Sequence, residues 1–483
     1  MMEIIGNEAF NPDVNRVVLV NTDTKLEQFD LDTDQLAYIA SVRNPQDPQK
    51  AMQIITVNLY KHWLVLVFPD PQKKNEVLLE SYRLDGAGIQ SWANKNQITQ
   101  LCIEDLSDEQ GRLFATVEGL VLSNYQFLPY FSEAEKKKNC LASICIKGMP
   151  ESFLRKIIVL TEAVSRARDL VNEPLSSLNA PRFADEIIKM SQKSGIQIDV
   201  FDKERIEKEK MGGLLAVNKG SIDPPRFCIL NYHPENPINE KPLVLIGKGI
   251  VYDTGGLSLK PTPNSMDYMK SDMAGAAAVT GVMYAIAALN WPLRVIALIP
   301  ATDNRLDGNA YVPGDIIEMH SGHFVEVLNT DAEGRMILAD ALSYAKQYDP
   351  ELVIDIATLT GSAAVAVGNI GTVAMGNAPE ENMQQLVDAG TTCYERVVEF
   401  PLWEEYDKLL ESEVADFKNI GGRDAGAITA GKFLQRFTDY PWIHIDIAGP
   451  AFLFSPEGYR TAGGTGTGVR LLLEFIRNKY LND

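Results

Sequence analysis

The sequence predicts an α/β protein with a small N-terminal α/β domain and a larger C-terminal domain, in which a mostly parallel or mixed sheet is flanked by helices. The chain has 483 residues, which is more than a single ordinary hydrophobic core holds. Its 45% hydrophobic and 23% charged residues are typical of globular proteins. In the second half, strand-like apolar runs alternate with helical patterns, and this alternation favours a sheet covered on both faces.

The first 150 residues form the predicted N-terminal α/β domain. A helical pattern spans residues 114–122, and no cluster of reactive side chains stands out. Short apolar runs separated by polar residues indicate strands at residues 17–20, 54–57, 63–68, 101–103 and 143–146.

A long helix is predicted between the two domains. Its apolar stripe begins after Pro150 and stops before Pro174, which indicates a connecting helix over residues 151–172. We expect residues 173–483 to form the larger C-terminal domain. Its strands are predicted at 196–201, 227–231, 243–246, 295–299, 352–356 and 443–447, and its helices at 273–289, 336–347 and 468–479.

Charge and cysteine usage exclude several classes of protein. A net charge of -20 argues against a nucleic-acid or anionic-membrane binder, which would need clustered Lys and Arg. Five cysteines without a Cys-x-x-Cys pair favour a reducing compartment. The N-terminus lacks signal-peptide features, and the apolar run 273–289 is shorter than the roughly 20 residues of a membrane span. We therefore expect a cytoplasmic protein without a membrane partner.

Residues 329–335 read Asn-Thr-Asp-Ala-Glu-Gly-Arg and precede an apolar helical pattern. Thr330 and Glu333 have the spacing of a capping box, so a structural role at a helix start is one interpretation. The other interpretation is half of a metal site, because a second cluster of acids and lysines lies upstream, in residues 247–260 and 270–273.

The polar residues that could carry chemistry follow predicted strands. Lys248, Thr358 and Ala448 each come within a few residues of the end of one strand. Ligands of open α/β sheets bind outside the carboxyl ends of the strands. Several separate segments are therefore expected to meet at one crevice.

Four carboxylates brought together would resist ionisation unless divalent cations neutralise them, so two metal ions are predicted. A lysine ligand needs its neutral amine, and Lys248 has an alternative role in a salt bridge to Asp253 or a phosphate contact. His320 and His323 have ligand-like spacing, but such a pair is more often a packing or surface feature. The candidate set is Lys248, Asp253, Asp272, Asp331 and Glu333, with Lys260 and Arg335 as cationic companions.

At these residues the chain resembles the leucyl aminopeptidase family, also called cytosol aminopeptidases. The signature is residues 329–335, with support from residues 167–174, 245–260, 312–316 and 355–361. The resemblance covers residues 160–483 strongly and the N-terminal part only by position and size. It implies a metallopeptidase that releases N-terminal, leucine-like apolar residues from peptides by water activated between two metal ions.

The resemblance also implies a role for each candidate residue. One metal would be held by Asp253, Asp331 and Glu333, and a tighter one by Lys248, Asp253, Asp272 and Glu333. Zinc is the usual first metal, and manganese, magnesium or cobalt can occupy the looser site. Lys260 and Arg335 match the two catalytic positions, and the arginine of relatives holds a bicarbonate that acts as general base.

Substrate binding and assembly follow from the same resemblance. Relatives are homohexamers. One residue more than usual lies within 261–265, which affects loop shape near Met269. The positions that match the substrate pocket are Met269, Asn329, Thr358, Leu359, Gly361, Ala448 and Ala451.

Two alternatives remain open from the sequence. The scaffold could serve a non-peptidase role as a DNA-binding or structural hexamer, although the acidic balance counts against DNA. The second alternative is a phosphoesterase, which could bind two metal ions through a similar cluster of carboxylates.

Overall fold

The computed structural model describes residues 2–7, 14–44, 52–70, 72–74, 76–107 and 109–481. They fold into two compact units, the first formed by Met1–Glu162 with Pro456–Thr461 and the second by Ala163–Ser455 with Ala462–Asp483. Helix α5 (Glu151–Asn172) contains the point at which the chain passes from one unit to the other. The predicted fold class, a small α/β unit followed by a larger one with a mixed sheet, is confirmed.

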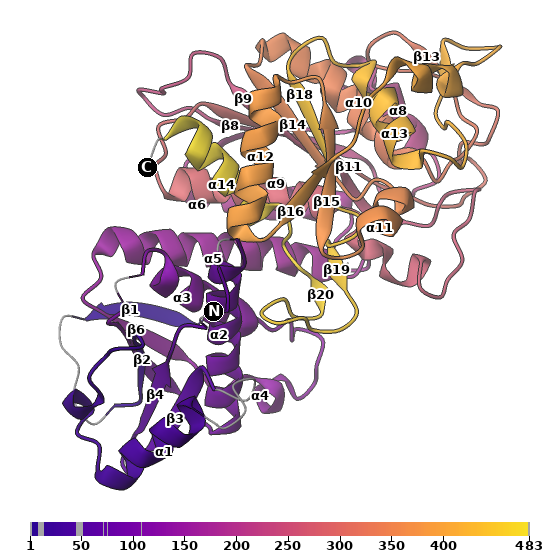
Figure 1. Cartoon of the computed structure of the whole chain (residues 1–483). Helices are drawn as coiled ribbons and strands as arrows, with labels where there is room; N and C mark the ends of the chain where they lie inside the picture. Colours follow the sequence, from indigo (N-terminus) through magenta and orange to yellow (C-terminus); the bar gives the residue numbers. More distant parts are fainter. Residues whose placement is uncertain are drawn as a thin grey trace. The chain divides into compact units, whose positions relative to one another are not determined.

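The smaller unit is built on a six-stranded sheet in the order β1-β6-β5-β2-β4-β3 (Figure 1). Strand β3 pairs antiparallel with β4, and the other neighbours pair parallel. One face packs on α2, α3 and the start of α5, and the other packs partly on α1. The elements are β1 Glu3–Asn7, β2 Arg16–Leu19, β3 Ile54–Asn58, β4 Trp63–Val67, β5 Gln100–Asp105, β6 Ser143–Lys147, α1 Thr33–Arg43, α2 Glu76–Lys95, α3 Arg112–Ser123 and α4 Ala134–Lys137.

Helix α2 was not predicted, because its packing surface uses glycine. A Cβ at Gly86 would lie 2.0 Å from the Thr116 carbonyl oxygen, and one at Gly119 would lie 1.9 Å from the Arg83 carbonyl oxygen. The two helices therefore touch through backbone. Glycine has low helix propensity, so the contact that joins α2 to α3 also weakens the sequence signal of α2.

The larger unit contains a nine-stranded mixed sheet whose main order is β16-β15-β18-β14-β9-β11-β8-β7, with β10 paired to β11. Figure 1 shows helices on both faces: α6, α9, α12 and α14 on one, and α8, α10 and α13 on the other. The elements are β7 Gln197–Phe201, β8 Arg226–Tyr232, β9 Leu243–Gly247, β10 Gly249–Asp253, β11 Val295–Asn304, β14 Leu352–Ala357, β15 Gly371–Gly376, β16 Arg396–Glu399, β18 Trp442–Asp446, α6 Ala180–Ser194, α8 Gly212–Asn218, α9 Ala274–Ala288, α10 Glu333–Ala345, α12 Glu380–Cys393, α13 Gly426–Gln435 and α14 Val469–Tyr480.

The central strands are buried along their whole length. Strands β9, β14 and β18 run parallel to one another, and every residue in them is buried. Continuous apolar runs of this kind are expected where helices cover both faces of a sheet. The carboxyl ends of the three strands consequently lie at one edge, where β9 leads into Lys248 and β14 into Thr358.

Three element boundaries near this edge differ from the prediction. Strand β11 continues to Asn304, helix α10 begins at Glu333, and strand β10 was not predicted at all. Strand β10 begins with Gly249, where a Cβ would lie 2.5 Å from the Pro300 carbonyl oxygen. A glycine required by close backbone approach removes the side-chain pattern by which a short strand is recognised.

The apolar segment Met266–Ala288, which contains α9, is long and apolar enough to cross a membrane by length and composition. However, 89% of its most apolar window is buried inside the protein. Helix α9 packs on β9 and β14, and a Cβ at Gly275 would lie 2.0 Å from the Ile356 carbonyl oxygen. It is a core helix, as predicted.

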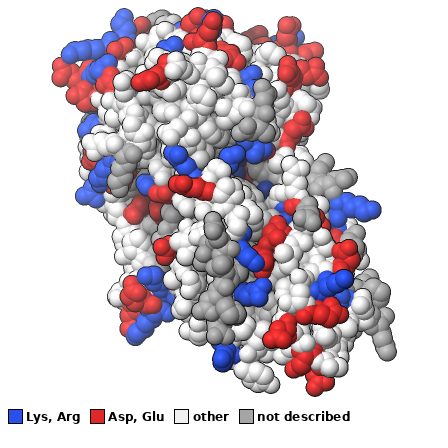
Figure 2. All heavy atoms as spheres, turned by 90° about the vertical axis from the view of Figure 1, so that its left-hand side faces the viewer, with Lys and Arg blue, Asp and Glu red and all other residues white. Residues whose placement is uncertain are grey.

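Charges are mixed on the surface. On the face shown in Figure 2, Lys and Arg side chains lie among Asp and Glu side chains rather than forming one continuous basic patch. This agrees with the net charge of -20.

Candidate metal centre and active site

The five predicted metal ligands come from four segments at the carboxyl edge of the larger sheet. Lys248 lies between β9 and β10, and Asp253 ends β10. Asp272 follows the 3-10 helix η3 (Met266–Ser271) and precedes α9. Asp331 lies just before α10, and Glu333 is its first residue. The structure brings all five side chains together.

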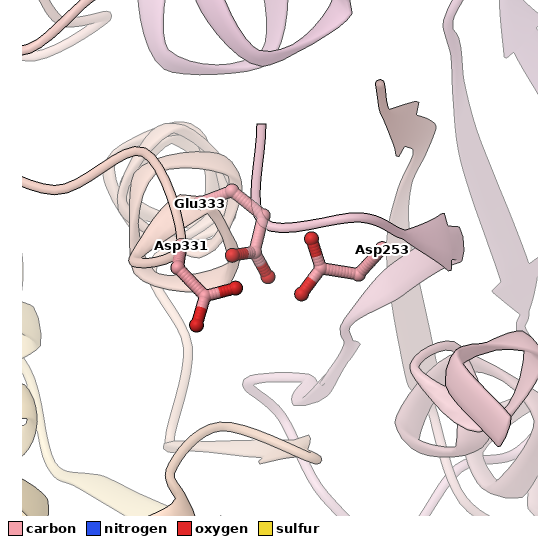
Figure 3. Close-up of side chains that lie close together, drawn as sticks. All are labelled: Asp253, Asp331 and Glu333. Carbon is pink, nitrogen blue, oxygen red and sulfur yellow. The ribbon is translucent and has the colours of Figure 1, made fainter. Parts of the chain in front are cut away.

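Figure 3 shows the carboxylates of Asp253, Asp331 and Glu333 pointing toward one another. One oxygen from each lies within 4.8 Å of the others. Asp253 and Glu333 are 1% exposed, so their charges are removed from water. Such a group is suited to holding a divalent cation, because hard cations prefer carboxylate oxygen.

Each of two lysines forms ion pairs with a different pair of carboxylates in the cluster. Lys248 Nζ lies 2.9 Å from Asp272 Oδ2 and 2.9 Å from Glu333 Oε1, and it donates a 2.8 Å hydrogen bond to the Thr358 carbonyl. Lys260 Nζ lies 2.9 Å from Asp253 Oδ2 and 2.6 Å from Asp331 Oδ1. The salt bridge considered for Lys248 and Asp253 is therefore made by Lys260 instead.

Burial perturbs the pKa of each carboxylate. Burial and the charge of Glu333 raise the pKa of Asp253 to about 7. Burial also raises the pKa of Asp272 well above its usual range and raises that of Asp331. Burial alone would raise the pKa of Glu333, but the charges of Lys248 and Lys260 lower it below the ordinary value. The cluster resists full ionisation, as predicted for crowded carboxylates.

The residues fit divalent metal ions. Glu333 Oε2 is buried and accepts no hydrogen bond within the described ranges. Asp272 Oδ2 and Asp331 Oδ1 are also buried; each has a lysine ammonium nearby, but not at hydrogen-bonding angles. Buried oxygens without donors are costly unless a cation satisfies them.

Lys248 can join such a site only as a neutral amine. Burial favours the neutral form, but the charges of Asp272, Glu333 and Asp253 raise its pKa above the ordinary value. Gly334 makes room for this lysine, since a Cβ there would lie 2.5 Å from Lys248 Cε. The glycine of the 329–335 motif is thus explained by close packing.

Arg335 is buried in the first turn of α10, where its Nη1 donates a 2.7 Å hydrogen bond to the Asn419 carbonyl. Its Nε has no hydrogen-bond partner in the part of the chain that the structure describes. Burial lowers the pKa of the guanidinium to about 10, which still leaves it charged at neutral pH.

Thr330 does not form the capping box that its spacing allowed. The N-cap of α10 is Ala332, and it has no side-chain cap. Thr330 Oγ1 instead donates to the Gly255 carbonyl at 2.7 Å and accepts from Ser258 N at 2.8 Å. Thr330 therefore joins the loop of Asp331 to the loop that follows β10.

Asn304 was not predicted as part of the site. Its Nδ2 donates to Asp253 Oδ1 at 2.8 Å and to the Thr330 carbonyl at 3.0 Å. Tyr311 donates to the same carbonyl at 2.8 Å. No sequence signal distinguished Asn304, because it reaches the site only through the pairing of β10 with β11, which places it opposite Asp253.

Four of the predicted substrate-binding positions, Asn329, Thr358, Leu359 and Ala448, make hydrogen bonds at the same edge. Thr358 Oγ1 donates to Asp272 Oδ1 at 2.8 Å. Asp446 was not predicted as part of the site. Its Oδ1 accepts hydrogen bonds from the Leu359 and Ala448 backbone amides, each at 3.1 Å. The remaining positions are Met269 in η3, Asn329 bonded to the Asp331 amide, Gly361 at the start of helix α11 (Gly361–Val367), and Ala451, which is buried.

Carboxylates and lysines gathered at the edge of an α/β sheet define the class of α/β proteins with a candidate metal centre at this edge. Residues 165–473 match the catalytic domain of the cytosol aminopeptidase family, and the chain belongs to this family. The resemblance inferred from the 329–335 motif is therefore confirmed, and the protein is a metallo-exopeptidase.

Individual relatives agree over most of the chain. A probable cytosol aminopeptidase of Chlorobium limicola is 42% identical over 424 residues, which are 84% of this chain and 81% of that protein. A probable cytosol aminopeptidase of Syntrophotalea carbinolica is 45% identical over 75% of this chain and 74% of its own length.

Two solved structures are similar in fold. The bottromycin maturation enzyme BotP in complex with Mn has a TM-score of 0.84 and 30% identity, covering 97% of this chain and 100% of BotP. A mutant of tomato leucine aminopeptidase has a TM-score of 0.86 and 27% identity, covering 100% of this chain and 97% of the tomato chain.

Proposed function

We propose that this enzyme removes single N-terminal residues, preferentially leucine-like apolar ones, from peptides with the help of two divalent metal ions. The observation that carries the proposal is the convergence of three carboxylates beside two lysines. Two of these carboxylates, those of Asp331 and Glu333, have a buried oxygen without a hydrogen-bond donor in the described part of the chain. Asp253, Asp331 and Glu333 would hold one ion. Lys248, Asp253, Asp272 and Glu333 would hold the other, which leaves Asp253 and Glu333 shared between them.

Bound divalent ions would polarise the scissile carbonyl and activate water near neutral pH. Zinc is proposed for the two ions, and manganese, magnesium or cobalt could occupy the looser site. The presence of manganese in BotP supports a divalent ion here. In the proposed arrangement the free amine of the substrate lies beside Asp272, so that only the terminal peptide bond reaches the centre.

Lys260 and Arg335 would act on the reacting groups. The Lys260 ammonium, between Asp253 and Asp331, would stabilise the negative charge that develops on the carbonyl oxygen. Arg335 would hold the bicarbonate or water that accepts the proton, and its free Nε supports this role. Both residues keep their positive charge at neutral pH.

The side chain of the released residue would lie near Met269 and Ala451, whose apolar character supports a leucine-like preference. Asn329, Thr358, Leu359, Gly361 and Ala448 would hold the substrate backbone. We also propose a cytoplasmic homohexamer in which residues 151–172 connect an N-terminal domain of residues 1–150 to the catalytic domain. The five free cysteines support a reducing compartment.

The deciding experiment measures hydrolysis of leucine p-nitroanilide by purified protein before chelation, after chelation and after zinc or manganese is restored. We expect activity to be lost and recovered with the metal. A phosphomonoester serves as the control substrate and should not be hydrolysed. A folded, metal-loaded sample that cleaves the phosphomonoester but not the anilide would contradict the proposal.

A further inference from the structure

Asn419 is a fully buried polar residue that contacts two parts of the site from a distant segment of the chain. It lies 84 residues after Arg335 and directly follows strand β17 (Phe417–Lys418), which pairs with strand β13 (Phe324–Glu326). The Asn419 amide continues this pairing, because it donates to the Glu326 carbonyl at 2.9 Å. Asn419 is therefore fixed beside the strand that leads into the 329–335 motif.

The side chain of Asn419 bonds the backbone just before Asp331. Its Oδ1 accepts from the Leu328 amide at 2.9 Å and from the Asn329 amide at 3.3 Å. Its Nδ2 donates to the Asn329 carbonyl at 2.8 Å. The Asn329 side chain in turn accepts from the Asp331 amide at 2.8 Å. Asn419 therefore holds both polar groups of the Asn329 backbone, and through them the loop that presents Asp331.

The backbone carbonyl of Asn419 holds Arg335. The Arg335 Nη1 donates to this carbonyl at 2.7 Å, while Nε has no partner within the described ranges. A guanidinium carries five N–H donors in a fixed plane, so a short bond to Nη1 restricts the directions in which the other donors can point. The position of the Asn419 carbonyl consequently limits where Arg335 can meet a bound anion or water.

A similar asparagine elsewhere in the larger unit shows what a loop contact alone looks like. The buried Asn239 accepts from the Arg294 amide at 2.8 Å and donates to the carbonyls of Lys241 and Arg294 at 3.0 and 2.9 Å. These bonds join the loops before β9 and β11, at the edge of the sheet opposite the metal centre. Asn419 makes the same three kinds of bond and adds a fourth, to Arg335.

We propose that Asn419 is a positioning residue, which joins Arg335 to the loop of Asn329 and Asp331 and so fixes the guanidinium relative to the metal centre. This proposal rests on the aminopeptidase function proposed above, in which Arg335 holds the bicarbonate or water that accepts the proton. Asn419 acts through these two segments rather than on the reacting groups. A displacement of about 1 Å at such a group costs up to about 10²-fold in turnover.

The test compares Asn419→Ala with Asn239→Ala in the full-length, metal-loaded enzyme acting on leucine p-nitroanilide. Both variants should lower Tm, because each loses three hydrogen bonds to the backbone. Only Asn419→Ala should lower kcat, by about 10- to 100-fold, with KM changed by no more than about threefold. An equal fall in kcat for both variants, or full recovery of Asn419→Ala in excess manganese, would overturn the proposal.

A double-mutant cycle shows whether Asn419 acts through the arginine. Once Arg335 has been replaced by alanine, Asn419→Ala should change kcat by less than about twofold, because the group that it positions is already absent. A further loss as large as that in the unmodified background would show that Asn419 acts elsewhere, and would overturn the proposal.

Asn419→Asp keeps the proposal testable if the alanine variant does not fold. It retains the shape and the acceptor for the Leu328 and Asn329 amides, and it replaces only the donor to the Asn329 carbonyl. We expect kcat to fall about tenfold, without a comparable fall for Asn239→Asp and without a further fall beside Arg335→Ala. Unchanged kcat in Asn419→Asp would contradict the proposal. Inactivity of the unmodified enzyme toward leucine p-nitroanilide would instead refute the aminopeptidase function itself.

Discussion

Lys260 is the residue whose charge faces both Asp253 and Asp331, so its removal tests catalysis most directly. We expect Lys260→Ala to lower kcat on leucine p-nitroanilide by about 10²- to 10³-fold, because a donor aimed at the developing oxyanion is lost. Metal content, measured by plasma emission, should remain close to that of the unmodified enzyme.

The control for this variant is Lys432→Ala, which removes a buried lysine elsewhere in the larger unit. Lys432 Nζ lies 2.8 Å from Asp407 Oδ2, outside the metal centre. Its loss should reduce stability without a comparable fall in kcat. Near-normal turnover by Lys260→Ala would exclude a catalytic role for Lys260.

Asn304 is expected to position Asp253 by holding it against the loop of Thr330. Asn304→Asp keeps the shape but replaces two donors with a negative charge, so the affinity for manganese should fall by tenfold or more, as for the loss of a partner behind a metal ligand. The measurement is a manganese binding isotherm. Asn218→Asp is the control, because the buried Asn218 also donates two hydrogen bonds, to the Asp223 carbonyl and to Thr302 Oγ1. Equal loss in both variants would show that Asn304 acts only on folding.

His444 makes stability depend on pH. It is fully buried and lies 2.6 Å from Asp355 Oδ1. Burial alone would lower its pKa, but Asp355, through charge and a hydrogen bond, and the charge of Asp446 raise it above 6.5, against a smaller opposing effect of Arg335. Because the folded-state pKa is raised, this stabilisation is complete below pH 6.5 and is lost as pH rises through the folded-state pKa.

We therefore expect the free energy of unfolding to contain a component that falls with rising pH above 6.5 and that His444→Gln removes. Urea unfolding in chelator between pH 6 and 9 measures it. His233→Gln, at a solvent-exposed position, serves as the control. A variant slope identical to that of the unmodified protein would assign the component to other groups.

At the scale of single elements, α10 depends on Gly334 for its distance from Lys248. Gly334→Ala should gain about 1 kcal/mol of helix propensity, yet its Cβ would displace Lys248, whose Cε would be 2.5 Å away. Overpacking costs about 1–3 kcal/mol, so we expect no net gain in Tm and a marked loss of metal affinity. Calorimetry with and without zinc tests both effects. Gly308→Ala, where nothing lies within 4 Å of the added atom, should bind zinc normally.

The elements that the sequence predicted best are those with continuous apolar patterns. Strands β9, β14 and β18 and helices α9 and α14 were found within one or two residues of their ends. Helix α2 and strand β10 were missed because glycines at close backbone contacts interrupt their patterns. Site residues could be identified from the sequence where charged residues lie close together along the chain, as in residues 329–335. Asn304 and Asp446 could not be identified in this way, because their roles arise from strand pairing and from loops that meet only in the folded structure.

At the scale of the whole molecule, the two units should respond differently to metal. The proposed ligands all belong to the larger unit, whereas the smaller unit is a separate sheet with its own core. A ligand that binds only the folded state stabilises it by about 2.7 kcal/mol at 100 times its Kd. Chelation should therefore destabilise the larger unit alone.

Hydrogen exchange read by mass spectrometry resolves the two units within one sample. After chelation we expect faster exchange in β10, in the loop before α10 and in the first turn of α10, because the carboxylates there lose the cation that balances them. Strands β2 and β4 of the smaller unit should exchange at an unchanged rate. If their exchange rises as much as that of β10, unfolding of the two units is coupled and metal stabilises the chain as a whole. If neither changes while activity is lost, the carboxylate cluster holds its geometry through Lys248, Lys260 and the Asn304–Thr330 contacts alone, and the metal contributes to chemistry without contributing to folding.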